Sequence, residues 1–270
     1  MSLGRKSERP RMTMIDGIVE EAEDTKSFWF FGDLKARPGQ FVMVWIPDVG
    51  QKPFGISYQE RGKFAITVRK VGSFTEKLFS LQEGEEAGIQ GPYGNGFSGK
   101  GENAALVGGG YGVAPLAFLA ERMSDAGKKV TLVNGAARES LLLYRQRFPK
   151  GSGKVKALYS TDDGSFGHKG FCTDCLSELL AGNGIDRVYC CGTEQMMKKV
   201  LDVCTKAKVP AEFSLDRYMK CGFGVCGSCC LGGTGLRVCR DGPVFTSAQL
   251  SKVTDFGRCR RDASGKKVDL

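Results

Sequence analysis

The sequence lacks the features that mark membrane-spanning and secreted proteins. None of its hydrophobic runs approaches the roughly 18–20 residues that a membrane-spanning helix needs. Its first residues, MSLGRKSERPRM, are charged and contain no hydrophobic segment of a secretory signal. We therefore expect a cytoplasmic protein whose cysteines stay reduced, which favours metal ligation over disulfides.

Histidine is nearly absent as well. The only one, His168, lies in a glycine-rich stretch and is predicted to be solvated rather than catalytic. No combination of histidine with aspartate and serine, of the kind that nucleophilic enzymes use, is evident. We therefore expect bound cofactors, rather than a protein acid and base, to supply the chemistry.

The positive charge of the chain does not indicate a nucleic-acid-binding protein. The net charge is +9, but residues 1–11 and residues 258–270 each carry +3 of it. Only +3 remains for residues 12–257, too little for a basic binding surface. We expect the two charged ends to be disordered, solvated tails.

The first part of the chain is predicted to be antiparallel β structure. Short runs rich in β-branched and aromatic residues, such as FWFF, QFVMVWIP, FGISY and FAITVRKV, end in glycine, proline or charged turns. Their number and spacing favour a β-barrel or a β-sandwich over residues 12–99. The glycine-rich stretch GPYGNGFSGKGEN, residues 91–103, is predicted to be the boundary of this domain.

After this boundary, buried strands alternate with helices, which predicts an α/β domain with a parallel sheet over residues 100–213. The expected strands are 103–107, 128–136, 154–160 and 186–192, and the expected helices are 114–127, 141–148, 173–184 and 194–208. Residues 214–257 are rich in cysteine and glycine and too few for a core of their own. We expect this third segment to depend on a bound metal.

Five of the eleven cysteines lie in one stretch of 19 residues inside this third segment. Cys221, Cys226, Cys229 and Cys239 have the spacing C-x4-C-x2-C followed by a more distant cysteine, which is typical of a plant-type 2Fe–2S site. Zinc sites more often use two C-x2-C pairs, and structural thiols are the other alternative. Cys230 is an alternative to Cys229, although the x2 spacing favours the latter. Glycines at 222, 224 and 227 would let the loop curl around a cluster.

A glycine-rich loop, LVGGGYGVAPL, follows the strand at 103–107 and precedes a helix. Glycines in this position let the backbone approach a pyrophosphate, and the helix start supplies N–H donors, although such a loop is often only a tight turn. Neither Arg138 nor Glu139, near the end of the next strand, decides between NAD and NADP. The stretch Cys172-x2-Cys175 has the spacing of a redox motif but lacks the preceding strand that such motifs have, so we expect no redox function there.

The stretch SLDRYMKCGFGVCGSC with RVCRDGPVF resembles the iron–sulfur segment of dihydroorotate dehydrogenase B electron-transfer subunits of the archaeal type. These belong to the ferredoxin–NADP reductase superfamily. The resemblance extends from about residue 12 to residue 250. It implies a β-barrel that binds FAD, a Rossmann-like α/β domain that binds NAD, and a small C-terminal lobe that holds a 2Fe–2S cluster.

The resemblance also implies which residues contact the cofactors. The stretch QKPFGISYQ corresponds to the flavin-binding Arg-Pro-x-Ser of the family, with Lys52 in place of arginine and Gly55 in place of serine. A lysine offers charge to a pyrophosphate without the two-pronged fork of arginine, so the flavin is expected to be held more loosely. The stretch TVRKVGSFT resembles a second flavin segment, in which the family prefers glycine where Phe74 stands. The implied FAD contacts are Lys52, Pro53, Phe54, Gly55, Ser57, Thr67, Val68, Arg69, Gly72, Phe74 and Thr75.

For the nicotinamide nucleotide, the implied contacts come from two stretches. The stretch YCCGTEQMM resembles a Cys-Gly-Pro-x-x-Met segment of the family and makes Cys191 a candidate neighbour of the nicotinamide; the alternative is a buried thiol at a strand end. The implied NAD contacts are Gly109, Gly110, Gly112, Pro115, Cys191 and Gly192.

The function implied by the resemblance is electron transfer in pyrimidine biosynthesis. A separate FMN-bearing catalytic subunit oxidises dihydroorotate, and the electrons reach NAD+ by way of the 2Fe–2S cluster and FAD. The implied assembly is a heterotetramer of two catalytic and two electron-transfer subunits. One alternative is a flavin and iron–sulfur subunit of a sulfhydrogenase or a ferredoxin:NADP oxidoreductase. Another is a zinc-binding regulatory module whose glycine loop is only structural.

Overall fold

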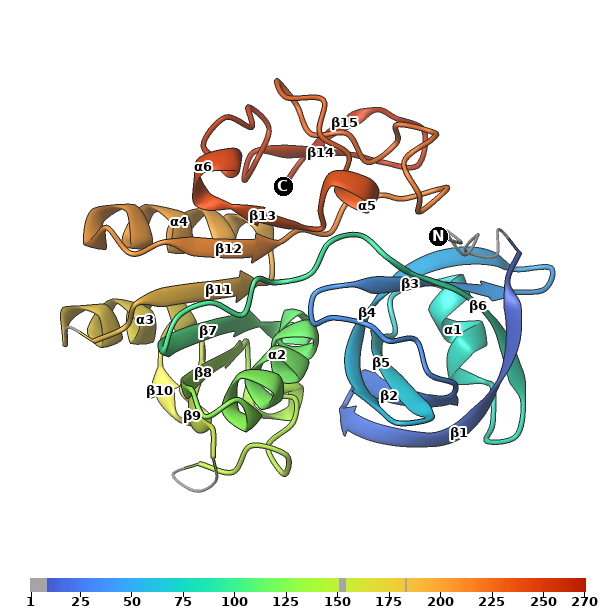
Figure 1. Ribbon diagram of the computed structural model, residues 1–270, viewed down its shortest axis with the longest axis horizontal. Coiled ribbons are helices and arrows are strands. Elements are labelled where there is room, and N and C mark those ends of the chain that lie inside the picture. Colours follow the sequence, from blue (N-terminus) through green and yellow to red (C-terminus); the bar gives the residue numbers. More distant parts are fainter. Residues whose placement is uncertain (1–8, 151–153, 183) are drawn as a thin grey trace, which may run out of the picture.

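The computed structural model describes residues 9–150, 154–182 and 184–270, which form a β-barrel, an α/β domain and a smaller C-terminal part (Figure 1). The predicted fold class is therefore confirmed. Residues 1–8 of the expected N-terminal tail lie outside the described residues. None of the helices in the described part is long and apolar enough to cross a membrane.

The barrel closes in the strand order β1-β2-β5-β4-β3-β6. Inward-facing aromatic and branched side chains, such as Phe28, Phe30, Phe64 and Ile66, fill its interior, as the alternating pattern of the strands requires. A short helix follows β5 and packs its Phe74 and Leu78 into this core. The elements are β1 (Arg11–Ala22), β2 (Thr25–Phe31), β3 (Phe41–Ile46), β4 (Gly50–Glu60), β5 (Lys63–Arg69), α1 (Ser73–Phe79) and β6 (Glu86–Tyr93).

The α/β domain is a seven-stranded sheet in the order β10-β9-β8-β7-β11-β12-β13, parallel except for β13. Alternate residues of the central strand β7 face opposite layers: Ala104 and Leu106 pack with α2, whereas Ala105 and Val107 pack with α3 and α4. The elements are β7 (Asn103–Gly109), η1 (Gly110–Gly112), α2 (Val113–Asp125), β8 (Lys129–Ala136), η2 (Glu139–Leu141), β9 (Lys156–Thr161), β10 (His168–Lys169), α3 (Cys172–Ala181), β11 (Arg187–Cys191), α4 (Glu194–Ala207) and β12 (Ala211–Ser214).

The prediction of a helix at 141–148 is wrong. Beyond the 3-10 turn η2 the segment is irregular, and Tyr144 has a φ of 58°, which no right-handed helix accommodates. Leu142, Leu143, Tyr144 and Phe148 are all buried, so the apolar run packs on several sides rather than along one face. An apolar run without flanking caps is ambiguous in this way.

The C-terminal part is joined to the α/β domain rather than separate from it. Its elements are α5 (Val238–Asp241), β13 (Val244–Thr246) and α6 (Ser247–Leu250), and β13 pairs antiparallel with β12 at the edge of the main sheet. Met219, Cys229, Leu231 and Val238 share one hydrophobic core with Phe213 of that sheet. The segment thus borrows its core from its neighbour, as its small size requires.

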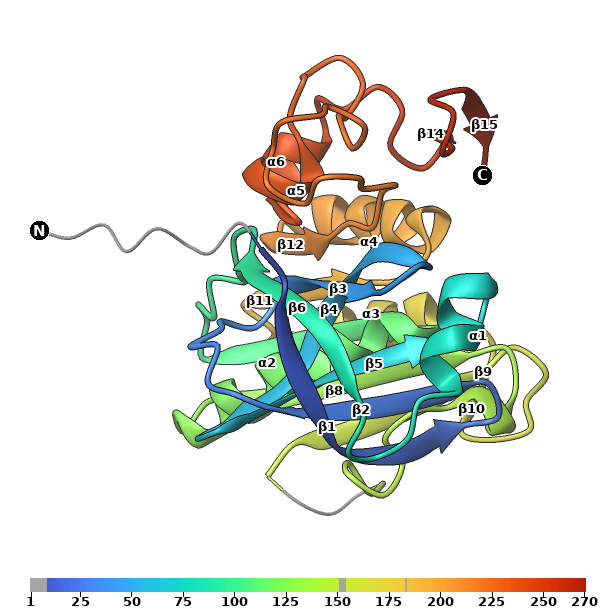
Figure 2. The ribbon, with the colours of Figure 1, turned by 90° about the vertical axis from the view of Figure 1, so that its right-hand side faces the viewer.

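Residues 258–270 were expected to be a disordered tail, and this expectation is wrong. The segment forms a β-hairpin of β14 (Cys259–Arg261) and β15 (Lys267–Asp269) (Figure 2). The buried Arg217 donates a hydrogen bond to the carbonyl of Cys259 (2.9 Å), and the amide of Gln195 donates to that of Leu270 (2.9 Å). These long-range bonds, which the charged composition of the segment does not reveal, hold both ends of the hairpin.

Candidate functional site

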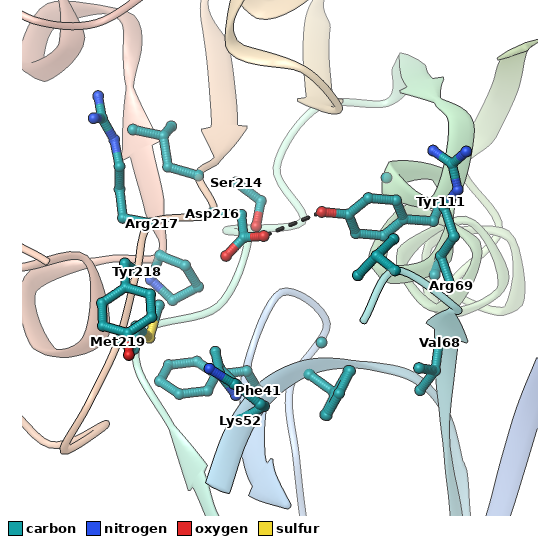
Figure 3. A pocket seen from close by; sticks show the side chains of 18 of the residues that line it. Phe41, Lys52, Val68, Arg69, Tyr111, Ser214, Asp216, Arg217, Tyr218 and Met219 are labelled. Carbon is teal, nitrogen blue, oxygen red and sulfur yellow. Dashed lines mark hydrogen bonds between the residues drawn. The ribbon is translucent and has the colours of Figure 1, made fainter. Parts of the chain in front are cut away.

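A cavity of about 630 Å³ lies where the barrel, the α/β domain and the C-terminal hairpin meet (Figure 3). Its walls come from segments far apart in the sequence. They include β4 and the turn after β5 from the barrel, the η1 loop and the end of β11 from the α/β domain, residues 214–219, and part of the hairpin. This is a region at the carboxyl ends of parallel strands, where open α/β sheets bind their ligands.

Most of the predicted flavin contacts line this cavity, and one does not. The lining contacts are Lys52, Pro53, Phe54, Gly55, Thr67, Val68, Arg69, Gly72, Phe74 and Thr75. Ser57 instead lies beneath the wall, where its hydroxyl accepts a hydrogen bond from Thr67 (2.9 Å). Phe74, which stands where the family prefers glycine, stacks on Phe54 with ring centres 6.0 Å apart. The surface offered to a flavin is therefore largely preformed.

Ser57 and Thr67, predicted as flavin contacts, belong to a buried network of hydroxyls below this wall that the sequence analysis did not predict. Thr67 hydrogen-bonds with Ser27, Ser57 and Tyr144, and Tyr144 comes from the irregular segment of the other domain. Burial raises the pKa of Tyr144 to about 12, so its phenol stays protonated and serves as a hydrogen-bonding group. This contact fixes the barrel wall against the α/β domain.

Two cations of the barrel reach the cavity with different partners. The ammonium of Lys52 lies over the ring of Tyr218, 5.1 Å from its centre, at cation–π distance. Arg69 pairs with Asp24 (2.6 Å), so part of its charge is already neutralised. Lys52 has no acidic partner among the described residues, and its contact with FAD stays a prediction.

The predicted nucleotide loop divides into cavity-lining and packing residues. Gly112, Pro115 and Cys191 line the cavity. A Cβ on Gly112 would lie 2.6 Å from the carbonyl oxygen of Cys191, and a Cβ on Gly109 would lie 2.5 Å from the sulfur of Met196. Gly110 adopts a φ of 56° with nothing near its missing side chain. Gly109, Gly110 and Gly192 stand outside the cavity lining, and Gly109 and Gly192 bring the ends of β7 and β11 close together.

Tyr111 and Asp216 are cavity residues that the sequence analysis did not single out. The hydroxyl of Tyr111 donates a hydrogen bond to the carboxylate of Asp216 (3.1 Å), as Figure 3 shows. The cavity walls desolvate the carboxylate of Asp216 and raise its pKa although the residue stays exposed to the cavity, and the hydrogen bond from Tyr111 opposes that rise. Burial also raises the pKa of Cys191 to about 12, so this residue is a neutral thiol and not a nucleophilic thiolate.

The four cysteines with ferredoxin-like spacing lie together as two pairs, Cys221 with Cys226 and Cys229 with Cys239. The backbone N–H of Val225 donates to the sulfur of Cys221, and that of Cys239 donates to the sulfur of Cys229 (both 3.4 Å). Glycines 222, 224 and 227 have φ values of 80°, 90° and 73°, as the predicted loop requires.

The thiols of this loop are chemically suited to ligation. Although burial opposes it, hydrogen bonds from Ser228 and Cys221 lower the pKa of Cys226 to about 6, and the hydrogen bond from Cys239 lowers that of Cys229 to about 6. Thiolates of this kind are the form that binds iron and zinc. Among the described residues no group of three or more ligands converges on a single metal ion. The pKa of Cys239 is raised in turn, because its thiol donates to Cys229, so this proton must leave when a metal binds. Two pairs of cysteines fit a two-iron cluster better than one zinc ion.

Cys230 and the cysteines of the α/β domain stand apart from these pairs. Cys230 forms a backbone bridge with Arg237, and burial raises its pKa. Cys172, Cys175, Cys190 and Cys204 belong to the hydrophobic core, and burial raises the pKa of each. Their position is that of small apolar side chains.

Two family models match the chain. The iron–sulfur cluster binding domain of dihydroorotate dehydrogenase B matches residues 216–251, and the oxidoreductase NAD-binding domain matches residues 106–202. The first match covers the four paired cysteines together with Asp216, and the second covers the glycine loop and Cys191.

Similar proteins span nearly the whole chain. The probable dihydroorotate dehydrogenase B (NAD(+)), electron transfer subunit, of Methanocaldococcus jannaschii is 42% identical over 97% of this chain and 99% of its own. The protein of the same name from Methanothermobacter thermautotrophicus is 44% identical over 96% of this chain and 97% of its own.

Solved structures agree with the fold. A chain of an NADH-dependent reduced ferredoxin-NADP oxidoreductase, studied for flavin-based electron bifurcation, is 31% identical with a TM-score of 0.80, over 90% of both chains. The ferredoxin reductase in carbazole 1,9a-dioxygenase has the same fold at 18% identity, with a TM-score of 0.66 over 76% of this chain and 68% of that one.

Proposed function

The chain belongs to the family of dihydroorotate dehydrogenase B electron transfer subunits, and we propose that it couples dihydroorotate oxidation by a separate catalytic subunit to the reduction of NAD+ in pyrimidine biosynthesis. The membership confirms the predicted oxidoreductase and its cofactors, FAD, a 2Fe–2S cluster and NAD. When bound, the cluster carries single electrons, the nicotinamide exchanges hydride, and the flavin does both.

The observation that carries this proposal is the continuity of one segment. Residues 214–219 line the cavity, and Cys221 follows two residues later. On the other side of the loop, Gly222 lies against Met43 of the barrel strand β3, with no room for a side chain between them. One short segment packed against the barrel thus joins the four cysteines to the cavity, as electron exchange between groups bound at the two places requires.

In this arrangement the chain's own residues bind and orient. Lys52 and the turn Gly72–Thr75 hold the FAD, the wall formed by Phe54 and Phe74 excludes water from it, and Gly112 with Cys191 allows a nicotinamide to approach. Cys221, Cys226, Cys229 and Cys239 hold the cluster. No side chain of the cavity is needed as a proton donor or acceptor for hydride exchange, which agrees with the neutral thiol of Cys191.

The partner is an FMN-containing catalytic subunit, in an assembly of two catalytic and two electron-transfer subunits. We place this assembly in the cytoplasm, because none of the eleven cysteines, all of which lie in the described part, forms a disulfide, and a reducing compartment keeps them so.

Reconstitution with a dihydroorotate-oxidising subunit tests the proposal. The purified chain should carry FAD, iron and sulfide, and should reduce an artificial dye with NADH. Mixed with the catalytic subunit, it should reduce NAD+ in the presence of dihydroorotate, whereas the chain alone should not oxidise dihydroorotate. Stoichiometric zinc without iron and sulfide would contradict the proposal and favour a zinc-binding regulatory module.

A second candidate function is favoured by the structural match at a TM-score of 0.80. In this alternative the chain is a flavin and iron–sulfur subunit of a ferredoxin:NADP oxidoreductase. It predicts normal FAD and cluster content, no NAD+ reduction with dihydroorotate and its catalytic subunit, and electron exchange with reduced ferredoxin instead.

A further inference from the structure

The C-terminal hairpin places positive charge in the wall of the cavity. Arg260, Arg261, Asp262 and Val268 of the hairpin line the same cavity as the turn Gly72–Thr75. In Figure 2 the hairpin and α1 lie on the same side of the molecule. A segment of this charge was expected to be a solvated tail, so its position over a cofactor cavity needs an explanation.

The charges that line the cavity do not balance within the described residues. Arg217 is neutralised by Glu194 (2.7 Å) and Asp255, and Arg69 by Asp24. The carboxylate of Asp262 also lines the cavity and stays charged, although the hydroxyl and backbone N–H of Ser264 and the backbone N–H of Lys266 bind it into the hairpin's own turn. What remains is Lys52, Arg260 and Arg261 against the two carboxylates of Asp216 and Asp262.

Neither hairpin arginine is satisfied by an acidic partner. The guanidinium of Arg260 makes no hydrogen bond or ion pair with any residue that the structure describes, and the guanidinium of Arg261 donates only to the carbonyl of Gly265 (2.8 Å). Desolvation by the cavity walls raises the pKa of Asp216, and the positive charge of Arg260 opposes that rise, so this charge acts inside the cavity. The two guanidiniums therefore have free donors for an anionic ligand.

We propose that the C-terminal hairpin is part of the dinucleotide site and that Arg260 and Arg261 bind the pyrophosphate of a dinucleotide held in the cavity. Guanidinium groups recognise phosphate oxygens with paired N–H donors, which the ammonium of Lys52 cannot do. The hairpin thus supplies the arginine contacts that the barrel lacks at position 52. The inference rests on the proposed function, because FAD and NAD(H) are the dinucleotides that bring a pyrophosphate.

The anchoring of the hairpin makes it a preformed binding element. Arg217, only 4% exposed, donates to the carbonyl of Cys259, directly before Arg260. Gln195 holds the carbonyl of Leu270 at the other end. A strand fixed at both ends loses little further entropy when a ligand binds, so its arginines contribute more than those of a mobile tail.

The test compares two variants that lose the same charge from the same hairpin. The double variant Arg260→Gln, Arg261→Gln removes the cavity charges, and the matched control Arg258→Gln, Lys266→Gln removes two exposed charges that do not line the cavity. Both are purified as holoprotein. The dissociation constant of FAD is measured by flavin fluorescence, and the KM for NADH by dye reduction. Unchanged iron–sulfur absorption reports that both variants are folded.

We expect the double variant to weaken one dinucleotide by about tenfold or more, the loss typical of a charge-assisted hydrogen bond, while the control stays within about twofold of the wild type. A raised dissociation constant of FAD with an unchanged KM for NADH identifies the pyrophosphate of FAD as the ligand. A raised KM for NADH with an unchanged dissociation constant of FAD identifies the pyrophosphate of NADH. Values equal to those of the control for both ligands overturn the inference. They leave the proposed function intact, because FAD and cluster are still bound.

A measurement on the wild-type chain covers the case in which the double variant does not fold. Phenylglyoxal modifies accessible arginines, and peptide mass analysis reports the modification of each one. With FAD or NADH present, Arg260 and Arg261 should be protected severalfold, and Arg258 should not. Equal modification with and without both dinucleotides would contradict the inference.

Discussion

The hydroxyl of Tyr111 donates a hydrogen bond to the carboxylate of Asp216 across the cavity, over 3.1 Å. The two residues belong to different segments, the glycine loop after β7 and the stretch that leads to the cysteines. Their contact joins the nucleotide-binding wall to the iron–sulfur segment.

Removal of this hydrogen bond should change the pH dependence of NADH binding. Because the Tyr111 hydroxyl stabilises the carboxylate form, Tyr111→Phe should move the pKa of Asp216 further upward. The carboxylate lines the cavity, so its charge affects the affinity for a charged dinucleotide. We expect the KM for NADH to titrate at higher pH in Tyr111→Phe, and this titration to vanish in Asp216→Asn. If the KM for NADH depends on pH in the same way in the wild type, Tyr111→Phe and Asp216→Asn, then Asp216 does not affect NADH binding.

The paired cysteines predict which thiol is dispensable. Cys226→Ser should lose the cluster, measured as iron and sulfide, because it removes one of the four predicted ligands. Cys230→Ser should retain about two irons per chain, because Cys230 is outside both pairs. Cys226→Ser should still bind FAD and reduce a dye with NADH but should not link dihydroorotate oxidation to NAD+. Full linked activity in that variant would show that the cluster is not on the electron path.

Two neighbouring glycines should respond differently to alanine. In Gly112→Ala the new Cβ would lie 2.6 Å from the carbonyl of Cys191, so the end of β11 must shift, at a cost of about 1–3 kcal/mol. The shift disturbs the cavity wall and should raise the KM for NADH. Gly110→Ala meets no atom and should lose only about 1–2 kcal/mol from its left-handed backbone, with a KM near the wild-type value. Chemical denaturation and dye reduction measure the two effects. A larger rise in KM for Gly110→Ala would contradict the geometry.

Loss of one partner of the buried pair Arg217 and Glu194 should destabilise the C-terminal part. Both side chains are almost fully buried, at 4% and 6% exposure, and their charged atoms lie 2.7 Å apart. Arg217→Met leaves Glu194 buried without its partner, which should cost about 3–5 kcal/mol and lower Tm by roughly 10 °C. The double variant Arg217→Met, Glu194→Gln should recover part of this loss. If Arg217→Met melts like the wild type, the pair does not stabilise the fold.

Several features of this protein follow from the sequence alone, because their causes are local. The four predicted ligand cysteines lie within 19 residues, and the glycines between them have the positive φ values that the loop requires. The alternation of strands and helices was evident because each element carries its own hydrophobic period. Prediction failed at 141–148, where an apolar run is buried on several sides, so that no single period describes it.

The cavity, in contrast, is a product of tertiary structure. Its walls range from Gly39 to Val268, and no short-range pattern indicates that residues so distant share one space. Tyr111 and Asp216 are 105 positions apart and meet only because β7 and β12 end at the same edge of the sheet. The sequence by itself determined the spacing of the predicted cysteine ligands, the two domain types and the glycine loop, since each depends on residues close in the chain. Only the tertiary structure decided that residues 258–270 form an ordered wall, because the bond that anchors them comes from Arg217, a side chain that the fold buries 42 residues away.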